Sequence, residues 1–160
     1  MRAVLTVIPQ MQTSADKMIA ELGAFEAGPN DDHAEYDLYQ ITEGYDNLRD
    51  KDRVVPSMFA VMERCGEADL GSPGPLVHCI ESLGYEHYLA QLVDSVRRKP
   101  TYLNAWMVSR ILNADIPEDH RQQLLVVLRT VSISPTASAS VIEQANGFLQ
   151  HQAKRGITNG

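Results

Sequence analysis

The sequence predicts an all-α fold, with about seven helices in a single domain over residues 1–160. Three observations support this prediction. Apolar residues recur at intervals of three and four along most of the chain, which is the spacing that gathers side chains on one face of a helix. Proline and glycine stand where such segments would begin or end. Runs with the alternating pattern of a strand are almost absent.

The N-terminal half, residues 1–74, is expected to open with a helix over residues 10–26. The Gly28-Pro29-Asn30 break would end this helix, because glycine and proline together mark a turn. Further along, Pro56 fits the first turn of a helix, where its missing N–H costs nothing. We expect that helix to end at Gly66.

Between these two segments a second helix is expected over residues 35–52. Asp31 and Asp32 are its candidate N-cap residues, since a short carboxylate can accept a hydrogen bond from the first free N–H groups. Gly44 weakens the helical pattern in the middle of the segment. The apolar face of this helix would consist of Leu38, Ile41, Tyr45 and Leu48.

The C-terminal half, residues 75–153, follows a proline- and glycine-rich break at residues 71–75 and is expected to end in a flexible polar tail, residues 154–160. Its expected helices cover residues 76–83, 85–98, 101–113, 117–128 and 135–149. Prolines open three of them at intervals of 17 or 18 residues, namely Pro100, Pro117 and Pro135. This period predicts helical hairpins that stack in a HEAT-like manner, with a compact bundle as the alternative.

Acidic residues are concentrated in one half of the chain. The net charge is −7, and residues 1–74 hold 14 acidic and 6 basic side chains, whereas residues 75–160 hold 7 and 8. This balance argues against a nucleic-acid binder, which needs clustered Lys and Arg, and favours a basic partner. No apolar run reaches the roughly 18 residues that span a bilayer, and the apolar N-terminal stretch ends at Pro9, too soon for a signal peptide. We therefore expect a cytoplasmic protein that binds neither nucleic acid nor membrane.

Residues that could form a catalytic or metal centre are sparse. The five histidines show no i, i+4 pair, and there is no Cys-x-x-Cys or Gly-rich phosphate loop. His78-Cys79 is the one arrangement to weigh, as core packing, as a zinc site with Cys65, or as a catalytic pair with His87 nearby. Neighbours on a helix project about 100° apart, so core packing is favoured. We expect no enzyme, no metal and no cofactor.

A cluster of acids and tyrosines predicts the partner-binding site. If residues 35–52 are helical, Glu35, Tyr39 and Glu43 lie on one exposed face, and Asp46 and Asp50 continue it. Like charges four residues apart repel one another, which indicates a function other than stability. The alternative is a solvated face that keeps the protein soluble. The predicted partner-binding residues are Asp31, Asp32, Glu35, Tyr36, Tyr39, Glu43, Asp46 and Asp50.

Three stretches in the second half carry a resemblance: residues 71–81, residues 95–101 and residues 106–113, which read GSPGPLVHCIE, SVRRKPT and WMVSRILN. Together they resemble helical immunity proteins of bacterial polymorphic toxin systems, of the contact-dependent inhibition and Rhs type. The resemblance implies a small cytosolic protein that binds the toxic C-terminal domain of a cognate effector and occludes its active site. Such toxins include nucleases, whose basic clefts suit a carboxylate-rich surface.

Within these stretches, Pro75, Trp106 and Arg110 are expected to determine the fold. Pro75 would begin a helix, Trp106 lies on an apolar stripe, and Arg110 could pair with a buried acid or cap carbonyl groups. The alternative function is a helical adaptor or regulatory subunit that binds another basic protein through the same surface.

Overall fold

A computed structural model describes residues 14–158, which form eight α-helices and two short 3₁₀ turns and contain no strand. The α-helices are α1 (Ser14–Ala24), α2 (Ala34–Ile41), α3 (Val55–Arg64), α4 (Gly74–Glu81), α5 (Tyr85–Arg98), α6 (Tyr102–Leu112), α7 (Glu118–Ser132) and α8 (Ala139–Thr158). The 3₁₀ turns are η1 (Tyr45–Asn47) and η2 (Lys51–Val54). The predicted all-α fold is confirmed. None of the helices in the described range is long and apolar enough to cross a membrane.

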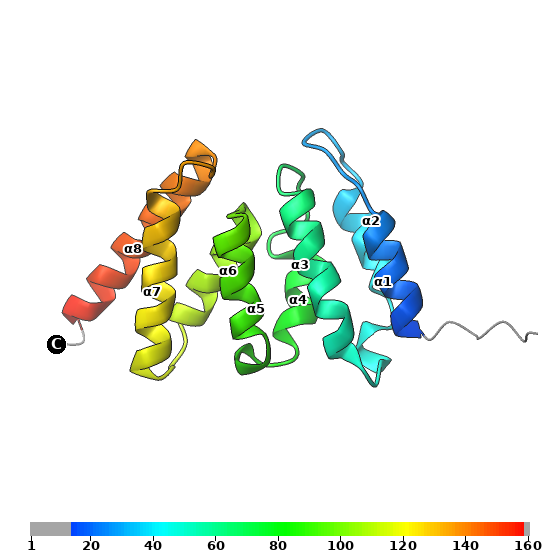
Figure 1. Ribbon diagram of the computed structural model, residues 1–160, viewed down its shortest axis with the longest axis horizontal. Coiled ribbons are helices and arrows are strands. Elements are labelled where there is room, and N and C mark those ends of the chain that lie inside the picture. Colours follow the sequence, from blue (N-terminus) through cyan, green and yellow to red (C-terminus); the bar gives the residue numbers. More distant parts are fainter. Residues whose placement is uncertain (1–13, 159–160) are drawn as a thin grey trace, which may run out of the picture.

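The helices form two layers. Helix α3 packs against α1 and α5, and α5 packs against α7, so the odd-numbered helices make one continuous layer. In the second layer, α2 packs against α4 and α6 against α8. Successive helices therefore pair as antiparallel hairpins that stand side by side, from α1–α2 at one end to α7–α8 at the other (Figure 1). This is the stacking of hairpins that the proline spacing predicted.

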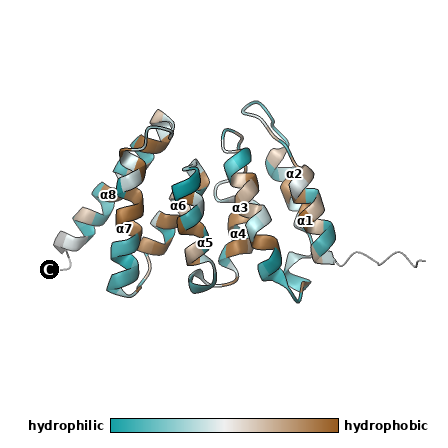
Figure 2. Ribbon diagram, in the orientation of Figure 1, coloured by the Kyte–Doolittle hydropathy of each residue, from teal (hydrophilic) through white to brown (hydrophobic). Residues whose placement is uncertain are grey.

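A single hydrophobic core runs between the two layers. Its largest fully buried side chains include Leu22, Leu38, Tyr45, Phe59, Met62, Leu76, Leu92, Met107, Leu112 and Leu124. They come from every helix between α1 and α7, and Val141 and Ala145 extend the core into α8. Figure 2 shows the apolar residues as stripes along the helices, separated by polar stretches. The three-and-four spacing in the sequence therefore identified the buried faces.

Several helix starts agree with the sequence signals. Pro56 lies in the first turn of α3, and Pro75 lies in the first turn of α4. Helix α6 starts with a capping box, in which the Thr101 hydroxyl accepts from the Asn104 N–H and the Asn104 side chain accepts from the Thr101 N–H. Arg97 and Arg98 lie in the last turn of α5, where positive charges interact favourably with the helix dipole.

Other boundaries differ from the expectation. The segment predicted as a flexible tail is helical as far as Thr158, because Arg155 of α8 donates to the Leu112 carbonyl oxygen at 3.1 Å and so ties the end of α8 to the end of α6. Helix α8 begins at Ala139, since the Ser134 hydroxyl accepts from the backbone N–H groups of residues 136 and 137 and so forms a turn. Residues 10–13 of the first predicted helix lie outside the described range.

The predicted helix over residues 35–52 is wrong. Helix α2 ends at Ile41, where the Thr42 hydroxyl donates to the Leu38 carbonyl oxygen at 2.8 Å. Gly44 then adopts φ +83°, a left-handed conformation that a right-handed helix cannot continue through. The N-cap of α2 is His33, which makes no side-chain cap, so Asp31 and Asp32 do not cap this helix.

A buried amide fixes the hairpin between α5 and α6. Asn104 is fully buried, and its oxygen accepts from the Thr101 N–H at 2.7 Å. Its Nδ2 donates to the Ser95 hydroxyl at 3.1 Å and to the Lys99 carbonyl oxygen at 2.9 Å. One side chain thus holds the end of α5, the connection and the start of α6 together.

We predict that Asn104→Ala lowers the free energy of unfolding by about 2 to 4 kcal/mol, because it removes a cap and leaves buried polar groups unpaired. Urea denaturation measures this loss. The matched control is Asn146→Ala on the exposed face of α8, which should change stability by less than about 0.5 kcal/mol. Equal effects of the two substitutions would contradict the structural role of Asn104.

Candidate functional site

The turn after α2 brings part of the predicted acidic surface into a hollow against α4. Tyr39, Glu43 and Asp46 line a cavity of about 450 Å³ together with His78 and Ser82. No Lys or Arg of the described chain lines it. We call this cavity the α2–α4 hollow. Because the chain bends at Gly44, these acids surround a hollow and do not follow one helical face.

The tyrosines of α2 are the most solvent-exposed aromatic residues in this part of the molecule. Tyr36 is 63% exposed and Tyr39 is 47% exposed. Glu35, on the same helix, is half-buried with its carboxylate beside Gly71 in the loop before α4. Exposed tyrosine offers contact area at a low cost in side-chain entropy.

The remaining predicted acids have other roles or lie elsewhere. Asp31 accepts a hydrogen bond from the His33 N–H at 2.9 Å, and Asp32 is exposed in the same turn. Asp50 accepts from Arg53 Nη1 at 2.8 Å, and Arg53 also contacts Asp16 of α1 at 2.7 Å. The Asp50 carboxylate is thus neutralised toward α1 and does not belong to the α2–α4 hollow.

Charge in and near the hollow stays negative. Lys51 lies 4.0 Å from Asp46 in a weak pair, in which the Asp46 side chain is exposed and the Lys51 side chain is partly buried over the Tyr45 ring. Within residues 14–158, Glu35, Asp37 and Glu43 form no salt bridge. Among residues 14–158, Lys51 is the only cation that forms a salt bridge with a carboxylate of the hollow, and Glu43 stays open to a cationic group of a partner.

His78 and Cys79 are neighbours on α4 with different environments. Burial raises the pKa of the Cys79 thiol to about 11, so the thiol stays protonated near neutral pH. His78 is exposed, and the sulfur of Cys79 is half-buried at the floor of the α2–α4 hollow. Both cysteines are free thiols, and Cys65 is buried. No group of three or more potential metal ligands exists among the residues that the structure describes.

A second aromatic surface lies on α6, and the sequence reading missed its exposure. The Tyr102 and Trp106 ring centroids are 5.8 Å apart, and the Arg110 guanidinium carbon lies 5.8 Å from the centre of the Trp106 ring. We call these three residues the α6 stripe. Trp106 was expected in the core, but it is only partly buried: it packs against the core, and Tyr102 and Arg110 contact it along α6. The spacing of Tyr102, Trp106 and Arg110 by four residues was the sequence signal that these side chains share one face of the helix.

An ion pair joins the α6 stripe to α4. Arg110 Nε lies 2.5 Å from Glu81 Oε1, and Arg110 Nη2 lies 2.9 Å from Glu81 Oε2, which is a bidentate pair. The predicted partnership of Arg110 with an acid is confirmed, although Glu81 is only partly buried. Within the layer of even-numbered helices, this ion pair connects α4 to α6.

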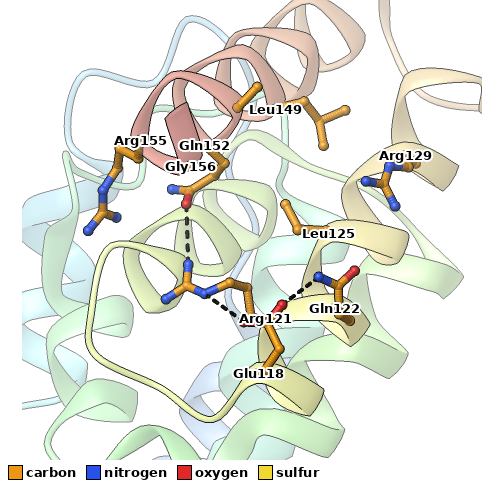
Figure 3. A pocket seen from close by; sticks show the side chains of 10 residues that line it. Glu118, Arg121, Gln122, Leu125, Arg129, Leu149, Gln152, Arg155 and Gly156 are labelled. Carbon is orange, nitrogen blue, oxygen red and sulfur yellow. Dashed lines mark hydrogen bonds and ion pairs between the residues drawn. The ribbon is translucent and has the colours of Figure 1, made fainter. Parts of the chain in front are cut away.

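The opposite end of the molecule carries basic residues. Arg121, Arg129 and Arg155 line a groove of about 540 Å³ between α7 and α8, with Leu125 and Leu149 also lining it (Figure 3). Arg121 donates to the Leu112 carbonyl oxygen at 2.9 Å, and Arg155 donates to the same oxygen. Two of the three guanidinium groups therefore cap the C-terminus of α6.

With this geometry in hand, comparison with known proteins identifies no relative: no protein-family model, no curated protein and no solved structure matches the chain.

We predict that Cys79 in the folded protein reacts with iodoacetamide at least tenfold more slowly at about pH 8 than in concentrated urea. The reason is that the folded pKa of about 11 leaves less thiolate than the ordinary value of 9.0. Mass spectrometry of the peptide that contains Cys79 measures the rate. The folded rate should rise as pH increases from about 9 to 11. A folded rate equal to the urea rate would contradict the raised pKa of Cys79.

Proposed function

We propose that this protein is an immunity protein that binds the toxic C-terminal domain of a cognate effector in the cytosol. In this proposal it occludes the active site of the toxin, with no turnover of its own. The toxin would be a domain with a basic cleft, as in a nuclease. The resemblance of residues 71–113 to immunity proteins suggests this role, and the surface of α2 and α4 supports it.

The observation that carries the proposal is the α2–α4 hollow. It combines exposed tyrosine with carboxylates that form no strong salt bridge, and these carboxylates belong to the half of the chain that holds the whole negative excess. A basic cleft is built to hold phosphate groups, so carboxylates can take their place. The long-range field of the acidic half would also speed the encounter with a basic domain.

Rigid placement of these groups favours binding further. Tyr45 is fully buried beneath the hollow, and its hydroxyl donates to the Lys51 carbonyl oxygen at 3.4 Å. Helix α4 forms the opposite wall and is anchored in the core through Leu76 and Ile80. A surface that is already ordered loses less entropy when a partner binds.

The test uses the C-terminal domain of the protein encoded directly upstream of the gene for this chain, which is the place where the proposal puts the toxin gene. We predict that co-expression of this chain restores growth and that Glu43→Lys with Asp46→Lys abolishes protection. The affinity of the double variant should fall about 100-fold or more, since each reversed charge opposes a cation in a desolvated site. Its melting temperature should stay near that of the parent, because the side chains of Glu43 and Asp46 are exposed and the Asp46–Lys51 contact is weak at 4.0 Å.

The matched control is Asp119→Lys with Glu143→Lys, which makes the same charge change on exposed positions of α7 and α8. This control should keep its affinity within a few-fold. Association of the parent should slow as salt rises, because screening acts beyond about 8 to 10 Å at physiological ionic strength. Absence of binding by the parent chain would refute the immunity role, and equal losses in the two double variants would refute the site.

A further inference from the structure

The α6 stripe is a partly exposed helix face with two aromatic residues, and Arg110 at its end pairs with Glu81. Tyr102 is 48% exposed, although the adjoining residues Leu103 and Asn104 are buried. Trp106 and Arg110 continue the face along the helix. The Trp106 ring lies next to the Tyr102 ring and next to the Arg110 guanidinium group. Tryptophan, tyrosine and arginine are the residue types most enriched at the energetic centres of protein interfaces.

The stripe is held in place before any partner binds. The capping box of Thr101 and Asn104 fixes the first turn of α6, and the backbone oxygen of Tyr102 accepts from Gln144 of α8 at 3.0 Å. At the other end, Glu81 holds Arg110 through two hydrogen bonds. Each of the two ends of the stripe is therefore anchored to a different neighbour, which lowers the entropy lost on binding.

The charge beside the stripe indicates what would cover it. Tyr102 lines a hollow of about 350 Å³ with Glu67 and Asp69 of the loop before α4. Within the described chain, no Lys or Arg lines this hollow, and neither carboxylate forms a salt bridge. An aromatic ring beside two carboxylates suits a guanidinium or ammonium group, which gains from both the ring face and the opposite charge.

A second copy of this chain is a poorer complement. Three of its arginines line the α7–α8 groove, and two of them, Arg121 and Arg155, already bind the carbonyl oxygens at the end of α6. The acidic half of a second copy would be repelled by Glu67 and Asp69.

We infer that the α6 stripe is a second anchoring surface for the basic toxin domain, and that the hollow beside Tyr102 takes an arginine or lysine side chain of that domain. The inference rests on the proposed function and extends it from α2 to α6. The partner would then span the second layer from the α2–α4 hollow to α6 and stay clear of the arginines on α7 and α8.

The experiment measures toxin affinity for two single variants, Tyr102→Ala and Glu67→Lys, by isothermal titration calorimetry. Each should weaken binding about tenfold or more while the melting temperature changes little, because both side chains are exposed. The matched controls are Val126→Ala on α7, which is 47% exposed, and Glu86→Lys at the start of α5. Both controls should stay within twofold of the parent.

A direct readout of contact is also accessible, since Trp106 is the only tryptophan of the chain. Incorporation of 5-fluorotryptophan gives one ¹⁹F resonance, which should shift when unlabelled toxin domain is added. Parent-like affinity of both variants with an unmoved resonance would overturn this inference and leave the immunity role intact. No binding by the parent would overturn both. A shift that appears without toxin as the protein is concentrated would assign the stripe to self-association instead.

Discussion

The structure depends on the packing of each helical hairpin against the next. Helix α2 spans 8 residues and helix α4 spans 8, which is too short for either to be stable alone in water. Each must bury its apolar stripe against its hairpin partner and against a neighbouring hairpin. This requirement uses up the inward faces of both layers and leaves an outward face on each layer. The candidate partner-binding groups lie on the outward face of α2, α4 and α6 and in the loop before α4.

Charge is distributed along the stack in the same direction as the hairpins. The acidic residues lie toward α1 and α2, and three arginines lie between α7 and α8. The two ends use their charges differently. Arg121 and Arg155 act within the molecule, because they cap the last carbonyl groups of α6. Glu43 and Glu67 form no salt bridge within residues 14–158, whereas Asp69 accepts a hydrogen bond from the Gly71 N–H at 3.0 Å; Glu43 and Glu67 therefore remain available to an external cation.

In the region after α2, the backbone conformation of Gly44 produces a different acidic surface from the one that the helical periodicity predicted. The pattern of Leu38 and Tyr45 suited one continuous helix, and both side chains are indeed buried. Gly44 nevertheless turns the chain, and Tyr45 enters the core from a 3₁₀ turn. The burial of Tyr45 was thus predicted correctly, although the type of secondary structure that contains Tyr45 was not. The positions of the acidic residues next to this turn, Glu43 and Asp46, follow the backbone. These residues therefore line a hollow and do not form the single exposed helix face that was predicted.

The sequence by itself determined the helical class, most helix starts and the identity of the buried faces. These follow from local rules: the 3.6-residue period, proline in a first turn, and capping residues such as Thr101. The pairing of Arg110 with Glu81 and the meeting of Tyr102 with Glu67 and Asp69 were decided only by the tertiary structure. Residues 29 or more positions apart meet only when hairpins stack, and spacing along one helix carries no information about such contacts.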